Sequence, residues 1–164
     1  VYWRMGEYDK ALEYNDKSLR LREKENDLFG VAIVYNNIGN IHYKQEDFSK
    51  ALNYYNKSLK YKRRLNDSLG IGTAMNNIGC VLFQDKNYNK AINHFEKALS
   101  IRKKIDNKIG IAESLECLVE SHITMKNFKQ AKRYLTLSID NYKRLGNNQR
   151  IDQLNKKLGC LENE

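Results

Sequence analysis

The chain has 164 residues, of which 41% are apolar and 30% charged, and its formal net charge is +9. It contains no proline, which fits nearly continuous helix, and no apolar run approaches the roughly 18 residues of a membrane span. These properties predict a helical protein that does not enter a membrane, and the positive charge raises the question of an anionic partner such as nucleic acid.

The dominant feature is a repeat with a period of 40 residues, in which Gly39 and Ala51 recur as Gly79 and Ala91. The period predicts a partial repeat (1–26), three full repeats (27–66, 67–106 and 107–146) and a terminal capping helix (147–164). A fixed period of this size indicates a solenoid, in which each unit buries its apolar face on its neighbours. Because the chain opens in mid-repeat without a methionine, we expect it to be a fragment of a longer protein.

Each full repeat predicts two helices. In residues 27–66, Asp27 caps a first helix whose apolar residues recur every three or four positions until about Gln45. Asp47 caps a second helix, which continues to about Leu65. The same cap positions return later in the chain, at Asp67, Asn87, Asn107, Asn127 and Asn147 or Asn148.

Small residues at fixed positions predict close helix crossings. Gly39 and Gly79 lie midway along first helices, where glycine costs about 1 kcal/mol relative to alanine. Their recurrence suggests that a neighbouring helix passes too close for a β-carbon. The second helices carry a matching series of small residues, at Ala51, Ala91 and Ala131.

These residues resemble the tetratricopeptide repeat. The family signature W-x-x-L-G-x-x-Y…A-x-x-x-F is similar to the second unit, which reads Tyr35-x-x-Ile38-Gly39-x-x-His42 and then Ala51-x-x-x-Tyr55. The third unit matches as well, and the fourth matches more weakly because Val119 replaces the glycine. The resemblance covers essentially the whole chain. It implies an all-α fold, a right-handed superhelical solenoid of antiparallel helix pairs in a single domain over residues 1–164.

Two departures indicate a long subtype of the repeat. The unit has 40 residues rather than about 34, and Arg63 and Lys103 stand where the family has a closing proline. Such units resemble those of Pins-type spindle-orientation adaptors, kinesin light chains and bacterial sensory regions. The resemblance implies a non-catalytic module that holds an extended peptide in a concave groove lined by the first helices, within a signalling or scaffold protein.

Polar and aromatic residues of the first helices are the candidates for that groove. Asparagine suits an extended peptide because its side chain both donates and accepts hydrogen bonds, and the related long-repeat adaptors use ladders of asparagines. We expect the peptide to contact Asn36, Asn37, Asn40, Tyr43, Asn76, Asn77 and Phe83. The alternative is that some of these asparagines cap or bridge neighbouring helices.

Three carboxylates continue the same face in the fourth repeat. Glu113, Glu116 and Glu120 fall at positions i, i+3 and i+7 and would favour a ligand with Lys or Arg near that end. The alternative is that they pair with lysines of the adjacent unit.

Basic residues gather instead at the ends of the second helices, among them Arg22, Lys62 and Arg102. Cations there complement the negative helix terminus, by about 0.3 to 1 kcal/mol each, so we interpret them as solvated. Few aromatic residues lie among them, and we therefore do not expect nucleic-acid binding.

No catalytic or metal site is predicted, and no cofactor is expected. His42 and His122 share one repeat position on the packed side of the first helix and are interpreted as core residues. The cysteines, Cys80, Cys117 and Cys160, lack zinc spacing. We interpret them as packing residues, which favours a reducing, cytoplasmic location.

Three further functions compete with the peptide-binding module. One is a peptide-sensing regulator of the quorum-receptor type, which would control a response regulator or a transcription factor. Another is a basic nucleic-acid-binding surface. The third is a homodimer through exposed terminal repeats, because the truncated first unit exposes Tyr2, Trp3 and Met5.

Overall fold

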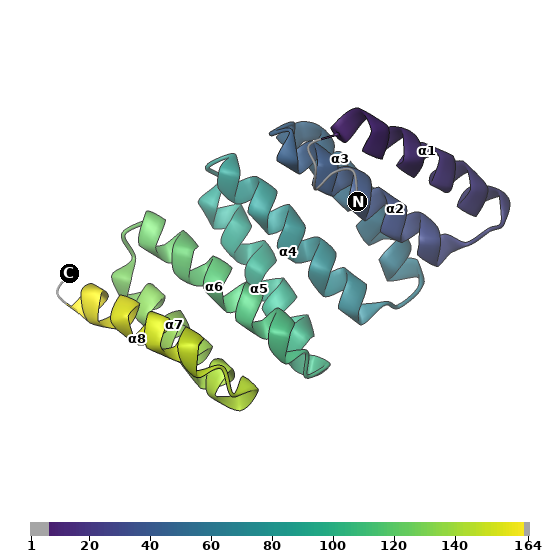
Figure 1. Ribbon diagram of the computed structural model, residues 1–164. Coiled ribbons are helices and arrows are strands. Elements are labelled where there is room, and N and C mark those ends of the chain that lie inside the picture. Colours follow the sequence, from purple (N-terminus) through teal and green to yellow (C-terminus); the bar gives the residue numbers. More distant parts are fainter. Residues whose placement is uncertain (1–6, 163–164) are drawn as a thin grey trace.

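The computed structural model describes residues 7–162, and this part of the chain contains helices and no strand (Figure 1). The helices are α1 (Tyr8–Lys24), α2 (Leu28–Lys44), α3 (Phe48–Arg64), α4 (Ser68–Gln84), α5 (Tyr88–Lys104), α6 (Lys108–Thr124), α7 (Phe128–Leu145) and α8 (Asn148–Glu162). The expected all-α solenoid is confirmed. Tyr2, Trp3 and Met5, which were expected to mediate self-association, lie outside the described residues.

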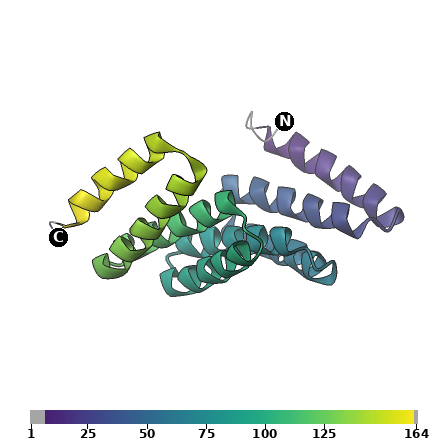
Figure 2. The same ribbon diagram turned by 90° about the horizontal axis from the view of Figure 1, so that it is seen from below.

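The helices form pairs that stack in a row. α2 packs most extensively against α3, α4 against α5, and α6 against α7, while α1 and α8 stand at the two ends (Figure 1). The row is bent into an arc (Figure 2).

The first helices α2, α4 and α6 lie on the inner side of this arc. α4 and α6 contact each other directly, whereas no two of the second helices α3, α5 and α7 approach each other as extensively. Side-chain hydrogen bonds also join α2 to α4 and α6 to α8. The closer spacing of the first helices gives the array a concave face, which is the face that the family resemblance predicts for ligand binding.

The turns between the helices share one geometry. Six of them place a non-glycine residue at a positive φ of 49 to 59°, among them Glu46, Lys86 and Lys126. The next residue donates its backbone N–H to the carbonyl five positions earlier, as Asp67 does to Lys62 (3.0 Å). Its side chain then caps the following helix at the expected positions, Asp27, Asp47, Asp67, Asn107 and Asn127, but not at Asn87.

The mid-helix glycines are required by close contacts, as expected. A β-carbon on Gly39 would lie 2.7 Å from the Tyr55 ring, and one on Gly79 would lie 2.5 Å from the Phe95 ring. Ala51, Ala91 and Ala131 are fully buried.

His42 and His122 are core residues, as the sequence predicts. His42 stacks on Tyr54 and His122 stacks on Tyr134, each with 5.4 Å between ring centroids. Both imidazoles are buried. They are therefore turned away from the concave face.

Candidate functional site

Two of the pockets between consecutive first helices lie among α2, α4 and α6. The first, which we call the tyrosine pocket, has a volume of about 270 Å³ and lies among α2, α4 and α6. Its lining includes Tyr43, Cys80, Phe83, Gln84 and Cys117. The second, the lysine pocket, has a volume of about 220 Å³ and lies between the N-terminal halves of α2 and α4. Its lining includes Phe29, Ile33, Lys62, Leu69 and Thr73.

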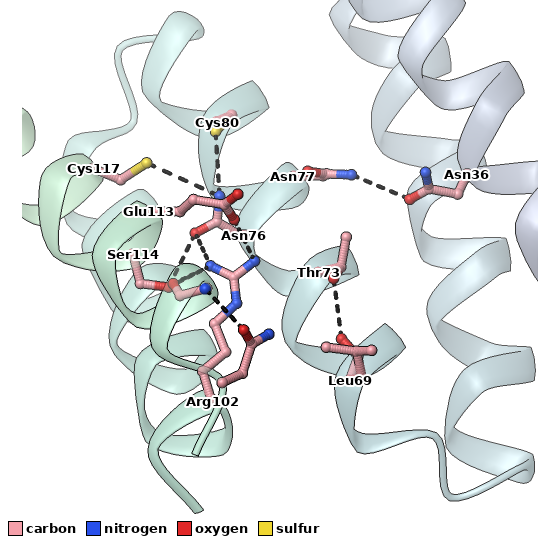
Figure 3. A network of polar contacts seen from close by, with 12 residues as sticks. Asn36, Leu69, Thr73, Asn76, Asn77, Cys80, Arg102, Glu113, Ser114 and Cys117 are labelled. Carbon is pink, nitrogen blue, oxygen red and sulfur yellow. Dashed lines mark hydrogen bonds and ion pairs between the residues drawn. The ribbon is translucent and has the colours of Figure 1, made fainter. Parts of the chain in front are cut away.

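Asparagines lie on α2 and α4 between the residues of these two pockets. Asn77 Nδ2 donates to Asn36 Oδ1 at 3.1 Å and joins the two helices (Figure 3). Asn40 Oδ1 accepts from the Tyr55 hydroxyl at 2.8 Å, whereas the side chain of Asn37 is exposed. Some of the expected ladder therefore bridges helices, and the Nδ2 of Asn36 and Oδ1 of Asn77 make no hydrogen bond with the described residues.

The structure corrects the expected exposure of Asn76, which is only 8% exposed. Its Oδ1 accepts hydrogen bonds from Arg102 Nη1 and from the Ser114 hydroxyl, both at 3.2 Å (Figure 3). Its Nδ2 points to the thiols of Cys80 and Cys117, at 3.9 and 4.0 Å. Asn76 is thus committed to the packing between α4, α5 and α6 rather than presented to the groove.

Arg102 is the centre of this network, and the prediction that it is solvated is wrong. The residue is 2% exposed, and its Nη1 also donates to the carbonyl of Gly110 (2.8 Å) and to Ser114 Oγ (2.7 Å). Its Nη2 donates to Glu113 at 3.0 Å. Burial lowers the pKa of Arg102, while the Glu113 carboxylate opposes that shift. The guanidinium is therefore a structural clamp across three helices.

The equivalent cation Lys62 also turns inward, whereas the Arg22 side chain is 40% exposed and pairs with Asp27. A β-carbon on Gly30, Gly70 or Gly110 would clash with the side chains of Arg22, Lys62 or Arg102, respectively. Each cation thus passes over the glycine in the first turn of the next helix. Sequence reasoning missed this arrangement, although a Lys or Arg eight residues before each of these glycines is a regular signal.

All three carboxylates of α6 are paired with cations of this chain, which agrees with the alternative interpretation. Glu113 pairs with Arg102, Glu116 pairs with Arg150 at 2.7 Å, and Glu120 pairs with Lys157. Glu116 also accepts from the Tyr142 hydroxyl at 2.7 Å. The groove wall at α6 is therefore close to neutral, and the expected attraction for a basic ligand is weakened.

The cysteines have different environments. Cys80 and Cys117 are half-buried on either side of the Asn76 amide, whereas Cys160 is exposed, so the packing interpretation is wrong for Cys160. Contact with the Cys117 thiol and burial raise the pKa of Cys80. Within residues 7–162, no three His, Cys, Asp or Glu side chains are arranged to hold a metal ion. No helix in that range is long and apolar enough to cross a bilayer.

Sequence reasoning also missed a row of exposed apolar residues at the rim of the concave face. Phe29, Leu69 and Ile109 occupy the same repeat position, one residue before the first-turn glycine, and are 55%, 54% and 66% exposed. Their 40-residue spacing could have revealed them, because an apolar residue that recurs at an exposed position is typical of an interaction surface.

Solved structures with the same architecture include proteins of different kinds. Aspartyl phosphate phosphatase F from Bacillus subtilis is 12% identical, with a TM-score of 0.88, and the match covers 94% of this chain and 40% of that one. A signal transduction ATPase with a tetratricopeptide repeat sensor, from Pyrococcus horikoshii, is 23% identical with a TM-score of 0.81, over 93% and 24% of the two chains. The N-terminal domain of stress-induced protein-1 from C. elegans is 25% identical with a TM-score of 0.68, over 82% and 97%.

The chain thus spans less than half the length of the first two of these proteins. Comparison with curated protein sequences found no significant match. The family model of the tetratricopeptide repeat matches residues 1–64, 31–104 and 70–144, which together include most of the chain. Together with the stacked helix pairs, this match shows that the chain belongs to the tetratricopeptide repeat family.

Proposed function

We propose that the chain is a non-catalytic module that binds an extended peptide segment of a partner protein along its concave face. The observation that carries this proposal is the placement of two pockets with unpaired amide groups between them. The tyrosine pocket and the lysine pocket are both open to the concave face and partly apolar, so each can hold a side chain.

The amides between the pockets suit the backbone of such a peptide. The Asn36 donor, the Asn77 acceptor and the exposed Asn37 side chain are unused within the described residues. An extended backbone presents alternating N–H and C=O groups, which these donors and acceptors match regardless of the peptide sequence. The pockets would then select the side chains.

A double variant tests this assignment. We expect Asn36→Ala with Asn77→Ala to weaken binding of peptides selected from a displayed random 12-residue library by about tenfold, as the loss of one or two hydrogen bonds implies. Because the two amides bond to each other, removing both leaves no orphaned partner, and the melting temperature should change little.

The matched control changes Asn53 and Asn93 to Ala, since both asparagines are exposed on the second helices. That variant should bind as the wild type does. Equal affinity of the groove variant and the control would reject the concave face as the binding site.

A sensory role is the second candidate, because one similar structure is described as a tetratricopeptide repeat sensor and another as an aspartyl phosphate phosphatase. In such a role the peptide bound on the concave face would be the signal, and an attached domain would respond to it. The coding sequence on either side of this chain tests the idea, since a peptide-responsive regulator requires an additional domain to regulate.

A further inference from the structure

The lysine pocket is lined by a cation that has no partner within the described residues. Lys62 is 6% exposed, and its ammonium makes no hydrogen bond or ion pair with the described residues. Burial lowers the pKa of Lys62, and the nearby Asp67 carboxylate only partly offsets this effect. A cation with so little contact with water normally has a partner, because its partial removal from water is costly without one.

The next repeat shows which partners the Lys62 ammonium lacks. Arg102 occupies the same repeat position and is held by Asn76, Ser114, Glu113 and the Gly110 carbonyl. Around Lys62 the position of Ser114 is taken by Ala74, which has no hydroxyl, and the position of Glu113 is taken by Thr73.

The remaining groups near Lys62 are already engaged. The Thr73 hydroxyl donates to the Leu69 carbonyl at 3.1 Å, and Asn36, which corresponds to Asn76, turns its oxygen to Asn77. Asp67 Oδ1 accepts from the Gly70 N–H at 2.9 Å as the helix cap, and Asp67 lies beyond ion-pair distance of Lys62. A carboxylate from outside the chain would complete the site.

We infer that the lysine pocket receives the side chain of a glutamate in the bound peptide, next to a large apolar residue. This inference rests on the proposed peptide-binding function. The pocket walls favour it, because Phe29, Ile33 and Leu69 are exposed apolar side chains around the cation and can pack on the methylene groups and on the neighbouring residue. The Lys62 ammonium supplies the complementary charge.

The recessed position of Lys62 selects a side chain over a peptide C-terminus. A terminal carboxylate is attached directly to the backbone, which must follow the groove surface. The glutamate carboxylate stands three bonds beyond its Cα and can descend between Phe29 and Leu69 to the ammonium. A charge-assisted hydrogen bond of this kind changes affinity by about 10- to 100-fold.

The experiment begins with selection from a displayed random 12-residue library on the whole chain. We expect enriched peptides to share a glutamate adjacent to a large apolar residue. Replacing that glutamate by glutamine in the synthetic peptide should weaken binding about 10- to 100-fold, and amidating the peptide C-terminus should leave the affinity unchanged. Loss of binding on amidation would instead identify a terminal carboxylate and overturn the inference.

Two protein variants and a control complete the test. Lys62→Met should remove the preference for glutamate over glutamine without lowering the melting temperature, because it replaces an unpaired cation on a largely buried side chain by an apolar side chain of similar length. Asp67→Asn should strengthen binding of the glutamate peptide by about threefold or more, since it removes the competing carboxylate. It should keep the helix cap that Asn107 provides in the next repeat. Lys60→Met, at an exposed position of α3, should have no effect.

The outcomes separate the two proposals. Peptides that bind and depend on Asn36 and Asn77 but show no glutamate preference would refute the lysine-pocket inference and leave the proposed function standing. An unchanged glutamate preference in Lys62→Met would also refute the inference. A library that yields no binding peptide would refute both.

Discussion

Replacing Asn76 by alanine should destabilise the protein far more than replacing Asn36, its counterpart one repeat earlier. Asn76 Oδ1 accepts from a buried guanidinium and from a buried hydroxyl. A hydrogen bond to a charged group contributes about 1.5 to 3 kcal/mol and a neutral one about 1 kcal/mol. Asn76→Ala should therefore lower the free energy of unfolding by about 2 to 4 kcal/mol. Asn36 accepts a single hydrogen bond from a half-buried amide, so its loss should cost about 1 kcal/mol or less.

Thermal and urea unfolding followed by circular dichroism measure the difference. For a chain of this length, 1 kcal/mol corresponds to about 2 to 4 °C, so Asn76→Ala should melt roughly 4 to 16 °C below the wild type. Asn36→Ala should melt within about 4 °C of it. Asn76→Asp keeps an acceptor for Arg102 and should recover most of the stability. Two alanine variants of equal stability would show that the Arg102 network does not hold the helices together.

Three further predictions concern backbone geometry and titration. Lys126→Gly should raise the free energy of unfolding by up to about 1 kcal/mol, because φ is 57° at Lys126 and glycine adopts this region without strain. A urea titration measures the change, and a free energy of unfolding below that of the wild type would contradict the turn geometry. Gly79→Ala should lower the free energy of unfolding by about 1 to 3 kcal/mol. Gly159→Ala should raise it by up to about 1 kcal/mol, because its β-carbon would meet no atom within 4 Å. Effects of the same sign in the two variants would refute the close crossing at Gly79. Burial and Glu96 raise the pKa of Tyr134 to about 12, so the folded state holds that proton more tightly than the unfolded state and stability should fall between about pH 10 and pH 12. Tyr134→Phe should reduce that fall, and an unchanged pH profile would contradict the assignment.

The periodic features were predictable because they depend on neighbours along the chain. The side chains of Asp27 and Asp67 each accept a hydrogen bond from a backbone N–H three residues later. Gly39 and Gly79 lie one repeat apart, and each indicates a close helix crossing at its position. Such signals are local or recur with the period. The helix boundaries and the pairing of helices follow from them.

The hydrogen-bond partners of the groove asparagines could not be predicted in the same way. Asn36 and Asn76 share a repeat position, yet one bridges two first helices and the other is enclosed by a guanidinium. The difference is set by residues 26 and 38 positions away in sequence, Arg102 and Ser114, which Lys62 and Ala74 replace in the preceding unit. A repeat position therefore defines where a side chain starts but not which partners it meets.

The repeat position alone also does not predict the environment of the charged residues. The end of a second helix looks solvent-exposed in sequence, and a cation there satisfies the helix dipole. The stacking of the next repeat brings Gly110 and Glu113 over that helix end, so Arg102 becomes buried. The pairing of Glu116 with Arg150 likewise joins residues 34 positions apart.

The two inward-turned cations, Lys62 and Arg102, have a mechanical consequence, because they join consecutive units with unequal numbers of hydrogen bonds. Arg102 ties α5 to both α4 and α6, whereas Lys62 makes no bond to α4 or α2. In a linear array, the coupling between adjacent units determines how cooperatively they open. Under an applied force we expect the junction between α3 and α4 to separate before the junction between α5 and α6, and an anionic ligand bound to Lys62 would stabilise it.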